Sequence, residues 1–526
     1  MNLRSFLEAK AQKNPEKIFL YYQGEKISYS EFDAKVNQAA NGFVETGVKK
    51  EDRVGLMMPN IPQFLYNWFG LCKMGGVIVP VNTHFRANEA QYVVNHSEAV
   101  GLVVHRDYLQ VALEIRKDCP HLRWIACVDG DGLTEGVIPY EQLSNNMPKE
   151  LNNIRLKDED LAAVIYTSGT TGFPKGAMHI HRNFTMTGEA FLLTAKLSPE
   201  DRLMVILPLY HVNAQFYSTM GALAADASLV LIRQFSASKF WGQAAQYGAT
   251  EFNFIGAVGR ILCARPEEEF RPEHTIRVAY GAGITPDVYE TFTRRFKIPY
   301  VIDGYGLTEV PRVCQNPIEG TIKMKSMGLP AKHPDPSVTF SQMKIIDDNG
   351  QEVPPGETGE LIVQSPVMMK GYFKDPPKTK EAFRDGWFYT GDYAYKDEEG
   401  YYFFVDRKKD IIRRRGENIS AREVETVINE NSKVLEAAVI AVPSELGEDE
   451  VMAFIVLKPN QFMSPEEVID WCKDRLASFK VPRFIQFRED LPRTSTQRTL
   501  KSVLKEEEGL IEKAHDMESY KKSLGL

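Results

Sequence analysis

The chain has 526 residues, more than one hydrophobic core can serve, because single cores stop growing near about 250–300 residues. We therefore expect two or more domains. Its 63 basic and 71 acidic residues give a formal net charge of -8, which provides no basic field for a nucleic-acid backbone. A nucleic acid is therefore not expected as a partner.

Cysteine content and hydropathy indicate the cellular compartment in which the protein is expected. Six cysteines with no C-x-x-C pair exclude a zinc ribbon and a thioredoxin-like motif, and sparse cysteine is typical of a reducing compartment. No apolar run reaches the roughly 18–20 residues of a membrane helix, so we expect no membrane span. The first ten residues include Glu8 and Lys10 and do not resemble a signal peptide. We expect a cytoplasmic protein.

The first two thirds of the chain alternate short β-branched runs with helix-like stretches. Val77–Val81, Gly101–Val104, Ala163–Tyr166 and Ser228–Ile232 read as strands, and Ser238–Tyr247 reads as a helix. Continuous apolar strands that alternate with helices are typical of parallel sheets covered on both faces. The predicted class is α/β: a large N-terminal domain of parallel-rich sheets with flanking helices.

The pattern changes after about residue 340. Shorter strands are predicted at Val338–Ile346, Glu360–Val363 and Tyr401–Val405, with a charged linker at Asp406–Asp410. Beyond the linker we expect a small, mobile α+β C-terminal domain, so the predicted domains are residues 1–406 and 407–526. Its elements are helix Arg422–Asn431, strands Glu436–Val442 and Val451–Leu457, helix Pro465–Ala477, and a solvated charged helix from Ser502 onward.

A phosphate-binding loop follows the apolar strand that ends at Tyr166. Glycines let backbone N–H groups turn toward an anion, while hydroxyl side chains and a lysine add donors and charge. The loop is not a Walker A motif, because Pro174 stands where that motif requires glycine. The residues expected to bind phosphate are Thr167, Ser168, Gly169, Thr170, Thr171, Gly172 and Lys175.

This loop, Y-T-S-G-T-T-G-x-P-K-G over residues 166–176, resembles the signature of the adenylate-forming superfamily, which includes acyl-CoA synthetases. Further motifs of that family follow in order, so the resemblance covers essentially the whole chain. It implies an ATP-dependent acid–CoA ligase. Such an enzyme forms an acyl-adenylate with release of pyrophosphate, and then an acyl-CoA thioester with release of AMP. The implied partners are a small carboxylic acid, ATP, Mg²⁺ and coenzyme A; the oligomeric state stays open.

Residues 302–309 resemble the Y-G-x-T-E motif of the family. Asp303 can accept from the adenine amino group, and the ring of Tyr305 can stack on the base. Thr308 can bond the α-phosphate, and Glu309 offers a hard oxygen ligand for Mg²⁺. Small residues on either side would let the nucleotide approach the backbone: Gly281, Ala282, Gly283, Gly304 and Gly306.

Residues 387–392 resemble the Y-x-T-G-D motif of the family, in which the aspartate accepts the ribose hydroxyls. Here that residue is Asp392. Arg407, close behind in the chain, would contact the ribose or phosphate.

The resemblance also implies a hinge. Family members rotate the small domain between the two half-reactions about a residue two after the conserved arginine, which is Lys409 here. The stretch 413–419 resembles the loop that lines the pantetheine tunnel, with Arg415, Gly416 and Glu417 as tunnel residues. Its three arginines, Arg413–Arg415, could meet CoA phosphates.

One motif departs from the family. The last motif reads P-x-x-x-x-G-K in relatives, and its lysine binds the reacting carboxylate and α-phosphate. Here Gln497 and Arg498 stand at the last two places. Arginine keeps the charge but has a different shape, so the adenylation role of Arg498 is open. Lys501, one helical turn further on, could substitute only if the segment shifts.

The sequence gives little information about which carboxylic acid is the substrate. The stretch 208–213 lacks the aspartate that holds an amino acid's ammonium in peptide synthetases, and no Gly-Gly-x-Ser carrier motif follows residue 500; a free thiol such as CoA is therefore favoured. His211 at the family's gate position, Phe254, Gly256 and Arg312 are expected at the acyl pocket, where Arg312 suggests a polar or dicarboxylic acid. Phe240–Gln243 with Arg260 give a subfamily-level likeness to crotonobetaine/carnitine–CoA ligases.

Two other classes remain. A nucleotide- or acyl-binding regulatory protein that has lost adenylation is the alternative raised by Arg498. A luciferase-like monooxygenase belongs to the same superfamily but has no positive support in the residues.

Overall fold

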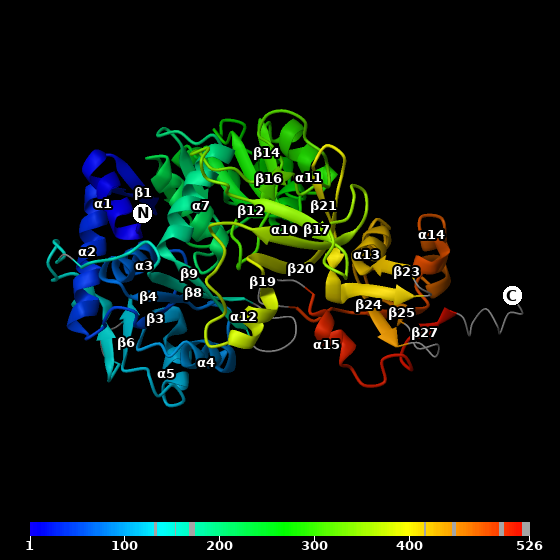
Figure 1. The fold of residues 1–526 in the computed structure, drawn as a ribbon, viewed down its shortest axis with the longest axis horizontal. Helices are drawn as coiled ribbons and strands as arrows, with labels where there is room; N and C mark the ends of the chain where they lie inside the picture. Colours follow the sequence, from blue (N-terminus) through cyan, green and yellow to red (C-terminus); the bar gives the residue numbers. More distant parts are fainter. Residues whose placement is uncertain are drawn as a thin grey trace, which may run out of the picture.

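The computed structural model describes residues 1–130, 134–152, 154–167, 174–414, 417–443, 449–493 and 499–517. Figure 1 shows the elements in an elongated arrangement. The N-terminal helices α1–α3 lie at one end, the green elements β12, β14 and α11 lie in the middle, and α13, α14, β24 and β25 lie at the other end. Among the described residues, no helix combines the length and apolarity needed to cross a membrane.

The first sheet contains the predicted phosphate-loop hairpin at its edge. Its strand order is β7-β6-β5-β3-β4-β8-β9, and every neighbouring pair is parallel except β8 and β9. The β-branched runs expected at 77, 101 and 163 form three of its strands. The bounds are β3 (Arg53–Met57), β4 (Val77–Pro80), β5 (Gly101–His105), β6 (Trp124–Val128), β7 (Val137–Pro139), β8 (Leu161–Thr167) and β9 (Lys175–Ile180).

The second sheet has a parallel centre with an antiparallel strand pair at each edge, in the order β16-β15-β14-β13-β12-β10-β11-β1-β2. Its parallel strands are buried, as their apolar runs require. The bounds are β1 (Ile18–Tyr22), β2 (Glu25–Ser28), β10 (Arg202–Val205), β11 (Ser228–Leu231), β12 (Glu251–Ile255), β13 (Val278–Ala282), β14 (Tyr300–Tyr305), β15 (Cys314–Gln315) and β16 (Leu329–Pro330).

Helices cover these two sheets. Their bounds are α1 (Leu3–Lys13), α2 (Tyr29–Glu45), α3 (Pro62–Met74), α4 (Ala87–His96), α5 (Leu109–Arg116), α6 (Tyr140–Ser144), α7 (His181–Thr194), α8 (Met220–Ala224), α9 (Phe240–Tyr247), α10 (Gly256–Cys263) and α11 (Pro286–Glu290). A π-helix, Asn213–Thr219, precedes α8. One apolar core extends across both sheets and their helices.

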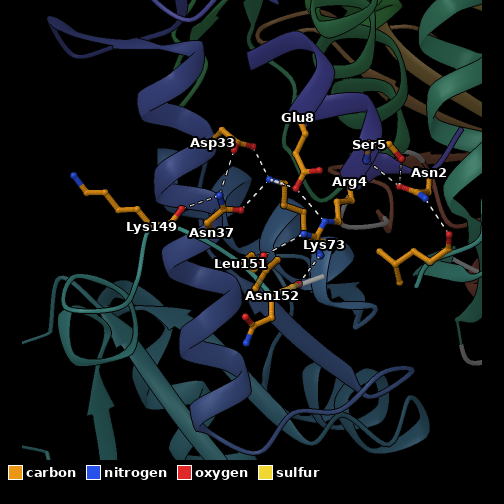
Figure 2. A network of polar contacts seen from close by, with 11 residues as sticks. Asn2, Arg4, Ser5, Glu8, Asp33, Asn37, Lys73, Lys149, Leu151 and Asn152 are labelled. Atoms are coloured by element: carbon orange, nitrogen blue, oxygen red, sulfur yellow. Dashed lines mark hydrogen bonds and ion pairs between the residues drawn. The ribbon is translucent and has the colours of Figure 1, made fainter. Parts of the chain in front are cut away.

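A buried lysine joins three of the N-terminal helices (Figure 2). Lys73 of α3 has no exposed surface, and its Nζ lies 2.6 Å from Asp33 Oδ1 and 2.8 Å from Asn37 Oδ1 of α2. Glu8 of α1 lies 3.2 Å from the same ammonium. A buried ammonium needs such acceptors, because an unpaired charge in the core is costly. The network therefore fixes α1 against α2 and α3.

A third sheet connects the two large sheets to the C-terminal elements. It contains β17 (Gln342–Ile346), β18 (Gly359–Gln364), β19 (Phe383–Arg384), β20 (Trp387–Lys396) and β21 (Tyr402–Arg407), with α12 (Pro376–Ala382) beside it. The charged stretch 406–410 is therefore not entirely a linker. Asp406 and Arg407 complete β21, and only Lys408–Asp410 forms a short turn of 3-10 helix before the next strand.

The C-terminal elements have an apolar core of their own, centred on Ile412, Val424, Ile455 and Val468. They are β22 (Ile411–Arg414), β23 (Glu417–Ser420), α13 (Ala421–Asn429), β24 (Val434–Pro443), β25 (Asp449–Leu457), α14 (Pro465–Lys473), β26 (Phe484–Arg488), α15 (Lys501–Lys505) and β27 (His515–Asp516). The large N-terminal domain and the smaller C-terminal one agree with the expected class, while the boundary at residue 406 stays a prediction.

The prediction of a charged helix that continues from Ser502 onward is wrong. Helix α15 ends at Lys505, Gly509 has a φ of +66°, and β27 pairs antiparallel with β26. The charged composition predicted a solvated segment, but Met517 packs into the C-terminal apolar core, which charge composition does not indicate.

Candidate functional site

The antiparallel hairpin β8–β9 carries the ends of the predicted phosphate loop. Thr167 ends β8, Lys175 begins β9, and the two residues are cross-strand partners. Lys175 Nζ lies 4.9 Å from the centre of the Tyr372 ring, a cation–π contact. The other predicted loop residues, Ser168, Gly169, Thr170, Thr171 and Gly172, lie outside the described residues.

The carboxyl ends of three adjacent parallel strands, β12, β13 and β14, form the centre of the site. This edge is where ligands bind in open α/β sheets. Asp303, near the end of β14, accepts from the backbone N–H of Gly283 at 2.9 Å and of Ile284 at 3.2 Å, which ties the turn after β13 to β14. Burial raises the pKa of Asp303 to about 7, opposed by these N–H donors and by Arg422.

Two glycines of the Y-G-x-T-E segment are sterically required. A Cβ on Gly304 would lie 2.1 Å from the Tyr280 hydroxyl, and one on Gly306 would lie 2.8 Å from the backbone nitrogen of Arg312. Both are closer than real Cβ atoms approach their neighbours. The glycines therefore let the strand end pack directly on the residues behind it.

The structure brings together Tyr305, Asp392 and Arg407 from three separate segments. The Tyr305 hydroxyl donates to Asp392 Oδ2 at 2.5 Å, and Arg407 Nε lies 3.5 Å from Asp392 Oδ1. Asp392 is only 2% exposed and pairs across β20–β21 with Arg407. The Asp392 carboxylate is therefore held in place by a tyrosine hydroxyl and a guanidinium.

The turn that carries Thr308 and Glu309 is held by hydrogen bonds to three other residues. The backbone oxygen of Thr308 lies 2.8 Å from His179 Nε2, and that of Glu309 accepts from the Met369 N–H at 2.7 Å. The Tyr372 hydroxyl donates to Glu309 Oε1 at 2.8 Å. Within the described residues, no cluster of three or more metal-ligating side chains occurs. A lone carboxylate suits Mg²⁺ that is bound chiefly through substrate phosphates.

Two of the predicted acyl-pocket residues, Phe254 and Gly256, lie at the carboxyl end of β12. Phe254 is fully buried on β12, and a Cβ on Gly281 would lie 2.8 Å from its ring. Gly256 begins α10, where a Cβ would lie 2.6 Å from the Gly283 oxygen. His211 is half-buried just before the π-helix that carries Tyr217. Single-turn π segments occur frequently at functional sites.

Arg312 is enclosed completely. Its side chain has no exposed surface, and its Cζ lies 5.4, 6.0 and 5.8 Å from the ring centres of Phe191, Tyr217 and Tyr280. Nη2 donates to the Thr194 hydroxyl and, at 3.2 Å, to Gln315 Oε1. Among the described residues, Nε and Nη1 make no hydrogen bond of standard geometry, although the Tyr280 hydroxyl is close enough to interact with the guanidinium. Burial lowers the pKa of the guanidinium.

The segment around the predicted hinge connects the third sheet to the C-terminal elements. Lys409 lies in the turn Lys408–Asp410, and the neighbouring Lys408 Nζ lies 2.8 Å from Glu360 Oε2. Asp406 Oδ2 accepts from the Ser420 hydroxyl at 3.0 Å and from the Arg422 N–H at 2.9 Å. These bonds attach the N-terminus of α13, which follows the predicted hinge, to β21, which precedes it.

Two C-terminal cations do not take the roles considered for them. Arg414 donates to the backbone oxygens of Phe479 and Val481, and its Nε lies 2.6 Å from Glu450, so it is used inside the C-terminal elements and is not available to CoA phosphates. Lys501 Nζ lies 2.7 Å from Glu425 Oε1 in a mostly buried pair, which makes it a poor substitute for a catalytic lysine.

Several predicted residues cannot be placed. Arg415, Gly416 and Arg498 lie outside the described residues, and for Glu417 only its backbone in β23 is described. Their roles stay predictions.

Sequence reasoning missed two residues of the site, Tyr372 and His179. Tyr372 lies 63 residues from Glu309 in a loop whose composition shows only a turn, and His179 is an isolated histidine on an apolar strand. Each contact follows from tertiary packing, so no local signal would have revealed either.

Comparison with known families gives two matches. A sequence model described as AMP-binding enzyme matches residues 7–373, and one described as AMP-binding enzyme C-terminal domain matches residues 423–498. Together they account for most of the chain.

Individual relatives agree with these matches. Crotonobetaine/carnitine–CoA ligases of Escherichia fergusonii and Shigella flexneri are each 32% identical over 492 residues, covering 91% of this chain and 93% of theirs. The crystal structure of ATP-bound MatB from Rhodopseudomonas palustris has a TM-score of 0.86 at 28% identity, covering 96% of this chain and 99% of that one. The o-succinylbenzoate CoA synthetase of Bacillus subtilis, in complex with its acyl-adenylate intermediate, has a TM-score of 0.83 at 26% identity, covering 95% and 98%.

Proposed function

This chain belongs to the family of AMP-binding enzymes, and we propose that it joins a carboxylic acid to coenzyme A through an acyl-adenylate. The observation that carries the proposal is the convergence of Asp303, Tyr305, Asp392 and Arg407 at the carboxyl ends of the β12–β14 strands. This arrangement offers a carboxylate for the base, a ring, and a preoriented carboxylate for the ribose at the edge of the sheet where ligands bind.

The reaction has two steps. A carboxylate oxygen of the acid attacks the α-phosphorus of ATP in line with the leaving pyrophosphate, which gives the mixed anhydride. The thiol of CoA then attacks the acyl carbon, and AMP leaves with the oxygen that the acid contributed. No general base is needed in the first step, because the nucleophile is already an anion; the protein must instead neutralise the repulsion between two anions.

Charge neutralisation is assigned to the residues around the β8–β9 hairpin. Lys175 would bind the phosphates from the strand end, and Thr308 would donate to the α-phosphate. Glu309 would hold Mg²⁺ together with the phosphates, and the ion would stabilise negative charge on their oxygens. Arg498 would approach the reacting carboxylate from the C-terminal domain, which would turn about Lys409 before CoA enters along the 415–417 loop.

The acid is proposed to end in an anionic or strongly accepting group. Arg312 is a fully buried cation, and in the described part of the chain it makes no ion pair and leaves two nitrogens without a hydrogen bond of standard geometry. A guanidinium does not shed its proton, so a ligand carboxylate would satisfy it with a forked pair once one of the aromatic rings that enclose it turns aside to admit the ligand. Crotonobetaine and carnitine, in the names of the 32% identical relatives, carry a permanent positive charge that Arg312 would repel.

A panel of acids tests the proposal. Purified protein, ATP, Mg²⁺ and CoA are incubated with monocarboxylic, dicarboxylic and betaine acids of matched length, and CoA thioesters and AMP are quantified. We expect thioester and AMP in equal amounts, with dicarboxylic acids turned over most efficiently. ATP binding without AMP or pyrophosphate release for any acid would instead support the alternative raised by Arg498, a regulatory protein that binds nucleotide.

A further inference from the structure

Strand β9 carries a buried imidazole that the proposed mechanism does not use. His179 has no exposed surface and lies four residues after Lys175. Side chains alternate along a strand, so residues 175, 177 and 179 point to the same face of β9. The face that presents Lys175 to the phosphates therefore also carries His179.

The hydrogen bonds of His179 determine its tautomer. Asn183 Nδ2 lies 3.1 Å from the Val367 oxygen and 3.0 Å from the Met368 oxygen, and it lies 3.0 Å from His179 Nδ1. Backbone oxygens only accept, so the amide nitrogen must face them and Nδ1 must be the acceptor of the ring. The proton is then on Nε2, which donates to the Thr308 oxygen at 2.8 Å. Burial lowers the pKa of His179 to about 4, so the ring is neutral near pH 7.

This donor fixes the peptide that precedes Glu309. On the other side of the turn, the Tyr372 hydroxyl donates to the Glu309 carboxylate, and the Tyr372 ring lies under the Lys175 ammonium. Contacts therefore run in a closed circuit from Lys175 along β9 to His179, through Thr308 and Glu309 to Tyr372, and back to Lys175. Within this circuit, His179 is the side-chain link between the lysine strand and the carboxylate turn.

We propose that His179 is a positioning residue for adenylation: its Nε2–H bond to Thr308 sets the separation between Lys175 and Glu309. The inference rests on the proposed function, in which those two groups hold the phosphates and Mg²⁺. It assigns a role in the first half-reaction and none in the second, because the described hydrogen bonds of His179 lead to Thr308 and Asn183 and to no predicted acyl-pocket residue.

Three substitutions of His179 distinguish a positioning role from a role in packing alone. In His179→Gln the amide nitrogen reaches the place of Nε2 and keeps the donor to Thr308. In His179→Asn the same group is one methylene shorter and reaches only the place of Nδ1. His179→Phe keeps the ring and loses the donor. His181→Gln is the matched control, because His181 is also fully buried and neutral but accepts from the Leu3 N–H, away from the turn.

The readouts are acid-dependent ATP–pyrophosphate exchange as a function of Mg²⁺, thioester formation from pre-made acyl-adenylate, and the thermal midpoint. Partners that orient a metal ligand typically contribute about 10–100-fold to metal affinity or activity. We expect His179→Phe and His179→Asn to need about tenfold more Mg²⁺ or to lose about tenfold in exchange rate. His179→Gln and His181→Gln should stay within about threefold of wild type, with thioester formation unchanged throughout.

Two results would overturn the inference. One is a folded His179→Phe or His179→Asn with normal Mg²⁺ dependence and exchange rate. The other is equal loss of both half-reactions in the Gln, Asn and Phe variants, which marks a packing role alone. If the Phe variant does not fold, the comparison of Gln with Asn decides. Failure of the proposed function looks different, because the wild-type protein itself would then show no acid-dependent exchange.

Discussion

Replacing Arg312 with leucine should invert the preference of the enzyme among acids. The guanidinium is fully buried against three aromatic rings, and two of its nitrogens make no hydrogen bond of standard geometry in the described residues. A substrate carboxylate that occupies those nitrogens gains hydrogen bonds to a charged group, each worth about 1.5–3 kcal/mol. At about 1.4 kcal/mol per factor of ten, losing one such bond lowers kcat/KM for a dicarboxylic acid by about 10–150-fold.

The same substitution should not harm a plain alkyl acid of equal length. Leucine removes a buried cation that an alkyl acid cannot satisfy, so kcat/KM for an alkyl acid should hold or rise. Residue 312 has a φ of +69°, which strains leucine and arginine alike, so the backbone cost does not change. Arg312→Lys keeps the charge without the fork and should fall between the two. Arg260→Leu, which removes an exposed arginine from α10, is the control.

The assay is the ratio of kcat/KM for thioester formation with the two acids in each variant. A wild-type enzyme that prefers alkyl acids, together with an unchanged ranking in Arg312→Leu, would refute the reasoning and make Arg312 a structural residue satisfied by its aromatic neighbours.

Four other outcomes are expected. Asp392→Ala should weaken ATP binding by about 1–3 kcal/mol in calorimetry, since Tyr305 and the ribose both lose their acceptor; unchanged affinity would remove Asp392 from the site. Lys409→Pro should restrict the hinge and impair one half-reaction far more than the other; equal loss argues against a pivot there. Arg498→Ala should slow pyrophosphate exchange by about tenfold or more but spare thioester formation from pre-made adenylate, and normal exchange would show the position to be idle. Burial lowers the pKa of His179 and His181 to about 4 from 6.5, so the unfolded chain binds more protons below pH 6.5 and stability falls as the pH drops toward 4. Each histidine should contribute a loss of about 2 kcal/mol between pH 7 and 5, measured by chemical denaturation and reduced in the Gln variants; a flat profile contradicts this.

Local patterns predicted the strands that approach the site. The apolar runs at 77, 101, 163 and 228 became β4, β5, β8 and β11 with ends displaced by two residues at most. Continuous β-branched runs leave few alternatives to a buried parallel strand.

Charge composition was a weaker guide. It predicted a linker at 406–410, but Asp406 accepts hydrogen bonds from the start of α13 and Arg407 pairs with Asp392, so both belong to an ordered strand end. It also predicted a long helix after Ser502, where Met517 instead joins the apolar core. A charge pattern shows which side chains prefer water, but it does not show which of them find partners.

Arg312 shows the limit of motif reasoning most clearly. Its place three residues after Glu309 predicted proximity to the acyl end, which stays a prediction; the structure places it against Gly306 and Tyr217. Its enclosure by Phe191 and Tyr280, from α7 and β13, depends on contacts more than thirty residues apart and has no local signature. His179 and Tyr372 escaped prediction for the same reason.

The fate of the acid's oxygen tests the central claim most directly. An acid that the panel identifies is labelled with ¹⁸O in its carboxylate and turned over with ATP, Mg²⁺ and CoA, and the products are analysed by mass spectrometry. Attack on the α-phosphorus followed by thiolysis predicts one labelled oxygen in AMP and none in pyrophosphate. Labelled inorganic phosphate with ADP, or unlabelled AMP beside a newly formed thioester, would contradict an acyl-adenylate intermediate.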